Sequence, residues 1–408
     1  MLRLILAPPL IVVTAVLWLP LLSELLSFLT GRAAAGPVTQ PKCRLPRLLF
    51  LVPAHNEELM IGSCLNALSA MQYPVEHRRI IVIADNCSDA TVSIAKECGV
   101  ETMERIDARL PGKPRAIAWA LDQIDLRQWD ACIIIDADSI VAPDFGLGVA
   151  DLRPLNDIVF QPNNVVLNEF DSWLTRLAGL LGRCRFEVTY PLKQSAGLNC
   201  PISNGMGIGT GVLMDGGWRS FSITEDTELY AIYTESGVKI RHAPLATVYS
   251  QEADSLRQGA TQRRRWLAGR LYIIREWGPR LLRSPRIGWR QKLDAFVELG
   301  LSGPVLHLLV ALAIVAISLL MVGGPLGQWI AILASISLSA LGVTTIVALA
   351  RHPEPYRTVS SFMMLPLYAA WRVLVLFGTM LTLRDKGWHR TARTAATPSV
   401  ASLTPPRA

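Results

Sequence analysis

Long apolar segments near both ends of the chain set the first limit on how it can fold. One run covers Leu4–Leu29, and three more cover Leu299–Val322, Trp329–Ala350 and Phe362–Leu383. Each run is long enough to cross a bilayer as a helix. Hydrophobic residues make up 51% of the chain and charged residues only 18%, and the apolar excess lies in these runs. The sequence therefore predicts a membrane protein with a soluble middle part.

The first run, within residues 1–30, predicts an uncleaved transmembrane anchor. The segment Arg32–Ala35 after it also permits a cleaved signal peptide. The run is longer than the usual core of a signal peptide, and the basic residues that follow it place that side of the membrane in the cytoplasm.

The C-terminal region, residues 299–383, predicts two or three spans. Its last run contains Arg372 and leads into a basic tail over residues 384–408, which is predicted to be disordered. Counting positive charges conflicts with three full spans in this region. The last run therefore lies either at the membrane interface or with the tail on the outside.

The formal net charge of +7 comes from 40 Lys and Arg against 33 Asp and Glu, and many basic residues lie beside the apolar runs. This placement is typical of a cytoplasmic membrane surface with anionic lipid. No nucleic-acid-binding module accompanies the charge, so nucleic acid is not an expected partner. Residues 271–298 combine arginines with Trp277 and Trp289, which predicts amphipathic helices in the headgroup region.

The middle part, residues 45–270, alternates between strand-like and helix-like segments. Strands are predicted at Leu48–Val52, Arg79–Ala84, Glu101–Glu104, Ala131–Ile135 and Asp157–Leu167, and helices at Glu57–Ala70, Asp89–Cys98, Lys113–Ile124 and Trp173–Val188. Helices of this length between strands imply a parallel sheet that is covered on both faces. The expected fold class is therefore α/β, with a doubly wound, mostly parallel sheet and flanking transmembrane helices.

The segment Ile133–Ser139 places two carboxylates at the end of a buried strand. Three isoleucines form the strand, and Asp136 and Asp138 follow it at positions i and i+2. Ligands of open α/β sheets bind outside the carboxyl ends of the strands. Two carboxylates there suit Mg²⁺ or Mn²⁺ that also holds a diphosphate. On this fragment alone, a strand end that only starts a turn is the alternative.

Other fragments carry polar groups in similar positions. Pro53 ends the first strand, and Asn56 and Glu57 follow at the start of a helix, where capping alone explains Asn56. Asp85 ends the second strand at the same edge of the sheet, where a carboxylate can accept a hydrogen bond from a base. Lys113 opens a helix after a Pro-Gly pair, so its cation and free N–H groups can face a phosphate.

The segment Thr224-Glu225-Asp226 starts a helix that ends near Ser236. Asp226 is a candidate general base, because a modest rise in its pKa lets a carboxylate take the proton of a hydroxyl group near neutral pH. An acidic first helical turn is a common feature without catalytic meaning, and it is the alternative here.

The basic segment Gln262–Trp266 follows further along the chain. Its arginines can neutralise a departing diphosphate, the indole of Trp266 can stack on a sugar ring, and Gln262 can hold hydroxyl groups. A basic patch beside the membrane is the alternative. That alternative explains Arg263 and Arg264 better than Gln262 and Trp266.

Taken in order, these fragments resemble a membrane-bound family 2 glycosyltransferase of the group that includes cellulose, chitin, hyaluronan and poly-N-acetylglucosamine synthases. The resemblance covers about Pro53 to Trp266 and rests on four motifs: Asp85, Asp136-Ala137-Asp138, Thr224-Glu225-Asp226 and Gln262-x-x-Arg265-Trp266. It implies a GT-A fold for residues 45–270 and a transferase that uses a nucleotide sugar and a divalent cation.

The resemblance also implies roles for individual residues. The nucleotide sugar would be bound by Pro53, Glu57, Asp85, Lys113, Asp136 and Asp138, and the metal ion by Asp138 and Asp136. Asp226 would be the base, with Glu225 and Arg265 as further catalytic groups. The acceptor and the diphosphate would contact Gly209, Thr210, Gln262 and Trp266. The assignment of the glycine-rich run is loose, because this chain lacks the aromatic form of the loop that the large synthases have.

The implied reaction is a direct displacement that inverts the anomeric carbon. Asp226 deprotonates an acceptor hydroxyl, and a nucleoside diphosphate, expected to be UDP, departs. The expected acceptor is a polysaccharide or a lipid-linked acceptor at the cytoplasmic face of the inner membrane, in exopolysaccharide or cell-envelope glycan synthesis. A polyprenyl-phosphate glycosyltransferase is the enzymatic alternative, although such enzymes usually lack the Gln-x-x-Arg-Trp motif. A non-catalytic membrane scaffold with a degenerate transferase fold is the alternative from another class.

Overall fold

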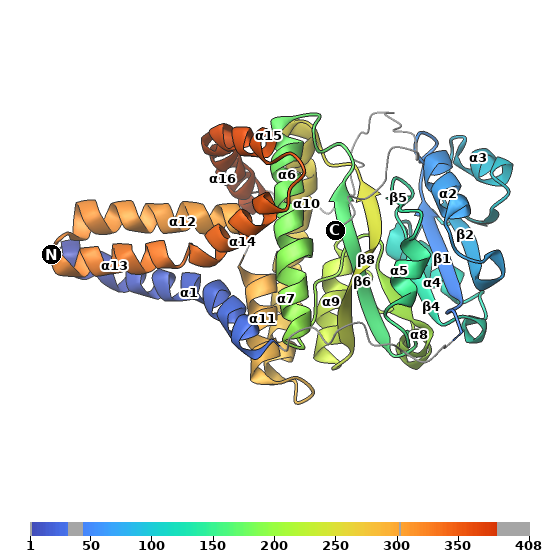
Figure 1. The fold of residues 1–408 in the computed structure, drawn as a ribbon, viewed down its shortest axis with the longest axis horizontal. Coiled ribbons are helices and arrows are strands. Elements are labelled where there is room, and N and C mark those ends of the chain that lie inside the picture. Colours follow the sequence, from blue (N-terminus) through green and yellow to red (C-terminus); the bar gives the residue numbers. More distant parts are fainter. Residues whose placement is uncertain (1, 32–43, 302, 382–408) are drawn as a thin grey trace.

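The computed structural model describes residues 2–31, 44–301 and 303–381. An α/β part lies at one end of the molecule, and α1 (Leu2–Thr30), α12 (Pro304–Ile317) and α13 (Gly324–Ile336) project from the other end (Figure 1). The segment Arg32–Ala35 and the basic tail 384–408, on which two of the sequence predictions fall, lie outside the described residues.

A single mixed sheet organises the α/β part. Its strands are β1 (Leu48–Ala54), β2 (Arg78–Asp85), β3 (Glu101–Arg105), β4 (Ala131–Ile134), β5 (Ile140–Val141), β6 (Ile158–Val166), β7 (Gly207–Gly209) and β8 (Lys239–Ser250). They lie in the order β3-β2-β1-β4-β7-β6-β8-β5. The first four strands in this order are parallel, β7 is antiparallel to both of its neighbours, and β6 is parallel to β8. The predicted doubly wound sheet is confirmed, with antiparallel strands in its second half.

Helices cover both faces of the sheet, as the alternation in β1 requires. On one face Phe50 and Val52 pack in a cluster with α2 (Ile61–Ala70) and α5 (Phe145–Ala150). On the other face Leu49 and Leu51 pack with α4 (Lys113–Leu121), α9 (Glu225–Glu235) and α10 (Leu256–Arg283). Side chains of alternating direction along one strand therefore join two separate cores.

Two details of the first β–α connection differ from the prediction. β1 continues through Pro53 to Ala54, because its pairing with β4 already ends at Leu51, so the missing N–H of Pro53 breaks no bond of that ladder. α2 begins at Ile61 and not at Glu57, and no side chain caps it. Asn56 adopts a left-handed conformation with φ 55° and accepts a hydrogen bond from the Ser88 N–H at 2.7 Å, so it does not cap α2.

A layer of helices separates the sheet from the apolar helices. It contains α6 (Trp173–Arg183), the π-helix η3 (Cys184–Thr189), α7 (Tyr190–Ser195), α10 and α11 (Trp289–Gly300) (Figure 1). α6 contacts β6 and α7 contacts β8, while α7 and α11 both contact α1. The boundary predicted at residue 270 falls inside α10, so the Gln-x-x-Arg-Trp motif shares one continuous helix with the first part of the segment predicted to lie in the headgroup region, and the rest of that segment leads into α11.

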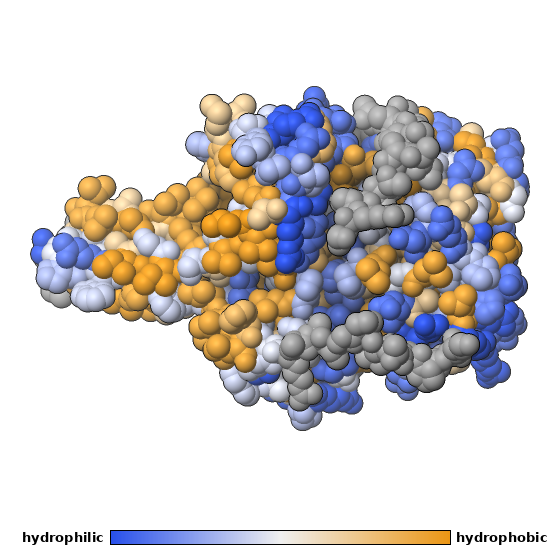
Figure 2. Space-filling model, viewed as in Figure 1, coloured by the Kyte–Doolittle hydropathy of each residue, from blue (hydrophilic) through white to orange (hydrophobic). Residues whose placement is uncertain are grey.

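Within the described residues, four helical segments are long and apolar enough to cross a membrane: Ile5–Thr30, Pro304–Val322, Gly324–Ala350 and Pro355–Thr379. The second joins α12 to the π-helix η4 (Ser318–Val322), and the third joins α13 to α14 (Ser339–Ala350). The fourth contains α15 (Pro355–Ser360), the 3₁₀ helix η5 (Ser361–Met364) and α16 (Leu365–Leu381). Apolar side chains cover the projecting helices, and hydrophilic side chains gather over the α/β part (Figure 2).

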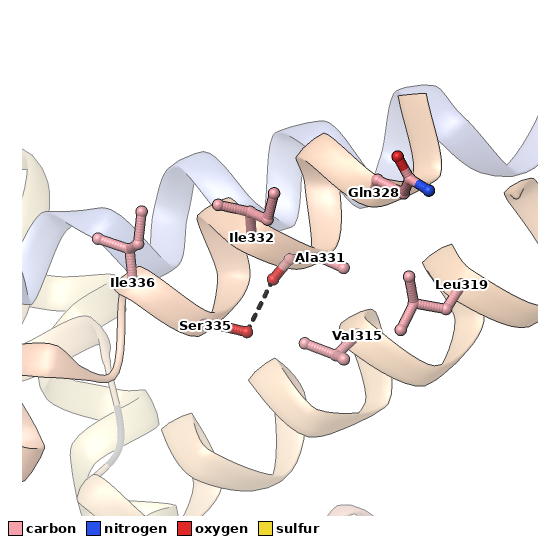
Figure 3. A pocket seen from close by; sticks show the side chains of 7 residues that line it. All are labelled: Val315, Leu319, Gln328, Ala331, Ile332, Ser335 and Ile336. Carbon is pink, nitrogen blue, oxygen red and sulfur yellow. Dashed lines mark hydrogen bonds between the residues drawn. The ribbon is translucent and has the colours of Figure 1, made fainter. Parts of the chain in front are cut away.

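A groove of about 460 Å³ lies between α12, η4 and α13. Its lining is apolar except for Gln328 and Ser335, and the Ser335 hydroxyl donates to the Ala331 carbonyl at 2.9 Å (Figure 3). The helices α12 and α13, which form this groove, project from the end of the molecule that lies opposite the sheet (Figure 1).

Candidate active site

The two aspartates of the Asp-x-Asp motif directly follow β4, at the carboxyl end of the parallel strands. The Asp136 N–H donates to Asn204 Oδ1 at 3.1 Å, and the Asn204 amide donates to Ser139 Oγ at 2.6 Å. Ser139 Oγ in turn donates to Asp138 Oδ1 at 3.2 Å, and Asp138 is buried. Asn204 therefore fixes the turn that carries both carboxylates, a role that no motif in the sequence marks.

Lys113, the first residue of α4, joins two motifs that are distant in the sequence. Its Nζ lies 2.6 Å from Asp136 Oδ1 and 2.8 Å from Glu225 Oε1. Burial alone would lower the pKa of Lys113, but the charges of Asp136 and Glu225 outweigh burial, and the pKa is raised. The ammonium group therefore stays charged and holds the Asp-x-Asp turn against the start of α9.

Asp226 lies in the first turn of α9, next to Glu225. Burial and the charge of Glu225 raise the pKa of Asp226 to about 6, while the Thr227 N–H, at 2.6 Å from Asp226 Oδ1, and the charge of Lys113 oppose the rise. A carboxylate with such a pKa accepts protons near neutral pH. The geometry therefore gives Asp226 the property that a general base needs.

The Gln-x-x-Arg-Trp residues lie on α10, which packs directly on the turn that leads into α9. A Cβ at Gly269 would lie 2.3 Å from Thr224 Oγ1, so the Thr224 side chain packs directly on the backbone of α10 at this glycine. Gln262 Oε1 and Arg265 Nε are buried and have no hydrogen-bond partner within the described ranges. Buried polar atoms without partners are costly, so a ligand that supplies hydrogen-bond partners to this part of α10 would be stabilised there.

Asp85 at the end of β2 is buried and occupied by protein groups. Its Oδ1 accepts from the Arg105 guanidinium at 2.6 Å, and its Oδ2 accepts from the Gly112 N–H at 2.9 Å. Arg105 also donates to Asp107 Oδ2 and to the Leu110 carbonyl, both at 2.8 Å. Asp85 therefore orders the loop that leads to Lys113. Carboxylate oxygens have further lone pairs, so Asp85 can still accept a hydrogen bond from a ligand.

The structure does not bring every predicted residue to this edge of the sheet. Gly209 pairs with Ala131 at the beginning of β4, the opposite end from Asp136, and the Thr210 hydroxyl donates to the Trp129 carbonyl at 2.7 Å. A Cβ at Gly209 would lie 2.2 Å from the carbonyl oxygens of residues 155 and 156. Close backbone packing explains this glycine, so we leave Gly209 and Thr210 out of the site. Two further predicted residues have contacts within the protein fold. Pro53 is buried within β1, and the Glu57 N–H donates to Thr91 Oγ1 at 2.7 Å.

The residues present can hold a divalent cation only together with a ligand. No group of three or more His, Cys, Asp or Glu side chains suits a metal ion in the described part of the chain. Asp136 and Asp138 supply two hard oxygen ligands at the sheet edge, and Mg²⁺ or Mn²⁺ takes further oxygens from phosphates. The donor set therefore fits a cation that arrives with a diphosphate.

Comparison with known sequences identifies relatives of this chain. The model of the family described as "Glycosyltransferase like family 2" matches residues 46–269. The chain is 26% identical over 244 residues to the "Probable glycosyltransferase YdaM" of Bacillus subtilis, with 56% of each chain covered. It is 27% identical over 194 residues to a "Beta-monoglucosyldiacylglycerol synthase" of Trichormus variabilis, with 45% of this chain and 40% of the relative covered. The matches thus span about half of these relatives.

Comparison with solved structures finds the same architecture. The mannosyltransferase PcManGT from Pyrobaculum calidifontis, in complex with GDP-Man and Mn²⁺, aligns with a TM-score of 0.55 over 94% of this chain and 98% of that chain. The two sequences are 18% identical, so the likeness concerns the GT-A fold.

Proposed function

Because this chain belongs to glycosyltransferase family 2 and is a transferase, we propose that it is an inverting enzyme of the membrane surface. It transfers a sugar from a nucleotide sugar, a UDP-sugar first among the candidates, to a polysaccharide or lipid-linked acceptor. Its α/β part faces the cytoplasm at the inner membrane, and its apolar helices lie in the bilayer. The acidic residues that the reaction needs, Asp85, Asp136, Asp138 and Asp226, are all present, which argues against a non-catalytic scaffold with a degenerate transferase fold.

One observation carries the proposal: Lys113 contacts both Asp136 and Glu225, next to Asp226. The Asp-x-Asp carboxylates, which bind the donor, and the helix turn that carries the base Asp226 therefore lie on two sides of the Lys113 ammonium group. Asp226 takes the proton of the acceptor hydroxyl, and the hydroxyl oxygen attacks the anomeric carbon from the side opposite the diphosphate. A pKa of about 6 keeps Asp226 ionised at neutral pH, as this role requires.

The departing diphosphate needs positive charge and hydrogen-bond donors. We assign this task to Arg265, whose buried Nε has no partner within the described part of the chain, and to Lys113. A bound divalent cation at Asp136 and Asp138 would supply further charge neutralisation. Gln262, whose Oε1 is also buried and unpartnered, and Trp266 would hold the acceptor, as carbohydrate hydroxyls and apolar sugar faces require.

A donor screen tests this function. The full chain is purified in detergent, and nucleoside diphosphate release is followed with UDP- and GDP-sugars, Mg²⁺ or Mn²⁺, and added lipid and oligosaccharide acceptors. Asp138→Ala is expected to abolish release and Asp226→Asn to reduce transfer by about 10²- to 10⁴-fold. The exposed Asp122 at the end of α4 provides the matched control, Asp122→Ala. Full transfer by Asp226→Asn would remove Asp226 from the role of base.

A further inference from the structure

Three arginines from two helices meet beside the Gln-x-x-Arg-Trp motif. Arg263 and Arg270 lie seven residues apart on α10, so they share a face and are separated by about 10 Å along the helix axis. Arg372 of α16 interacts electrostatically with both of them. We call Arg263, Arg270 and Arg372 the arginine cluster.

Aromatic packing holds the two helices together at this point. The Arg263 guanidinium lies 5.7 Å from the ring centre of Trp266, 5.8 Å from that of Tyr368 and 5.7 Å from that of Trp371. A Cβ at Gly259 would lie 3.4 Å from Trp371, so α10 and α16 are in close contact here. These neighbours are aromatic rings and not carboxylates, so the N–H groups of the guanidinium can still donate to an acceptor.

The cluster lacks carboxylate partners of its own. Among the described residues, none of the three guanidiniums forms an ion pair within 4 Å, and Arg263 Nε is buried without a hydrogen-bond partner. Glu252 acts on Arg263 only through longer-range electrostatics. Glu298 acts on Arg270 in the same way, but its carboxylate is already paired with Lys193 at 2.7 Å. Like charges brought together in a partly buried place favour the binding of an anion.

The anion that suits the cluster differs from the diphosphate of the donor. Arg265 lies on the same side of α10 as Gly269, which faces the start of α9. At 100° per residue, Arg263 and Arg270 lie about 140–160° around the helix from Arg265. A diphosphate held by Arg265 therefore leaves the cluster free. Arg270 also interacts electrostatically with Asp226, so the Arg270 end of the cluster is the end closer to the base.

The position of the cluster indicates where its ligand comes from. Arg372 lies within Pro355–Thr379, one of the segments apolar enough for a membrane, yet α16 contacts α10, α12 and η5. In Figure 1 α16 lies beside the helical layer and not among the tips of the projecting helices. A charged side chain in an apolar segment is costly unless it has a partner or a function. The cluster thus lies where the lipid surface meets the catalytic part.

We propose that the arginine cluster binds the phosphate group of a lipid acceptor and so presents a hydroxyl of that lipid to Asp226. The proposal rests on the proposed function and narrows its acceptor to a phosphate-bearing lipid. Arginine forms charge-assisted, bidentate hydrogen bonds to phosphate oxygens. Free phosphate offers the same oxygens, so the experiment must separate the lipid from the ion.

The test measures binding to the full chain in detergent with three probes: dihexanoyl phosphatidic acid, which carries the phosphate but no free glycerol hydroxyl and so tests phosphate binding alone, dihexanoylglycerol and inorganic phosphate. We expect the phosphatidic acid to bind and to raise Tm, and the phosphate-free lipid to bind far more weakly. Arg372→Gln and Arg263→Gln should each weaken phosphatidic acid by about tenfold or more. Arg275→Gln, an exposed arginine on α10, is the matched control and should bind like the wild type.

Each outcome decides the matter. Equal binding of both lipids, or equal losses in Arg275→Gln, overturns the proposal. Inorganic phosphate that binds as tightly as phosphatidic acid overturns the lipid assignment. Arg372→Lys, which keeps the charge, and the Tm of each variant without ligand separate lost binding from lost folding.

A wild-type chain that releases nucleotide but binds no phosphatidic acid contradicts only the proposed role of the arginine cluster. Binding without nucleotide release from any donor contradicts only the proposed function.

Discussion

The two sides of the candidate site differ in how their polar side chains are paired. On the side of the sheet, Asp85 accepts from Arg105 and Gly112, and Lys113 contacts Asp136 and Glu225. On the side of α10, Gln262 Oε1, Arg263 Nε and Arg265 Nε are buried and lack hydrogen-bond partners among the described residues.

This difference shows two ways of building a site. The ends of parallel strands are fixed by the sheet, so short side chains there reach one another and are ordered before a ligand arrives. The side chains of α10 are long and approach from a separate layer, and each buried unpaired group costs about 1–3 kcal/mol. A ligand that supplies their partners recovers this free energy, so we expect the α10 side to depend more on what is bound.

The largest loss of activity is expected when the Lys113 contact between the Asp-x-Asp turn and Glu225 is removed. Lys113→Met leaves the carboxylates of Asp136 and Glu225 close together without their cation. We expect kcat/KM for the donor to fall by about a hundredfold, as for the loss of one donor to a developing charge. Initial rates of nucleotide release measure this.

Lys96 supplies the control, because its contact with Glu104 at 2.7 Å is an exposed ion pair. Such pairs contribute about 0–1 kcal/mol, so Lys96→Met should keep wild-type kinetics. Wild-type kcat/KM in Lys113→Met would mean that the two carboxylates are held in place without it.

The next largest effect, on stability and on transfer, is expected when the contact of α10 with the start of α9 is disturbed. Gly269→Ala places a methyl group 2.3 Å from Thr224 Oγ1, so α10 must shift. We expect overpacking to lower the free energy of unfolding by about 1–3 kcal/mol and to displace Arg265 from the site. Thermal unfolding and transfer rates are both measured.

Gly278 lies on the same helix, and a Cβ there meets nothing within 4 Å. Gly278→Ala should therefore leave Tm unchanged or raise it, because alanine favours helix. Equal behaviour of the two glycine variants would show that α10 has room to adjust at residue 269.

The sequence predicted those parts of the molecule whose structure is set locally. The apolar run before Asp136 marks β4, and the acidic turn at Glu225 marks the start of α9. The prediction failed where a distant contact decides: Asn56 binds Ser88, 32 residues away, and α2 starts four residues later than predicted. Likewise the glycine-rich run forms β7 against the beginning of β4, which no local pattern shows.

Long-range pairing also explains what was missed in the site. Asn204 supports the Asp-x-Asp turn from a loop between α7 and β7, and a single asparagine carries no pattern. In the sequence, the charge of Arg372 conflicts with a membrane span in the apolar run around it. In the structure, Arg372 interacts electrostatically with Arg263 and Arg270. An isolated charge in an apolar segment was the one available signal of that contact.

The smallest effect is a shift in pH dependence. Asp226 acts as a base only when it is deprotonated, so kcat/KM should fall as the pH drops through about 6, its raised pKa, and level off above. Burial is the larger cause of the raised pKa, and the charge of Glu225 is the next. Glu225→Gln removes that like charge, so the acidic limb of the profile should move to lower pH. Glu235→Gln, at the far end of α9, should leave it in place. If the acidic limb of the pH profile stays in place in Glu225→Gln, Lys113 already cancels the repulsion between the two carboxylates. Burial alone would then raise the pKa of Asp226.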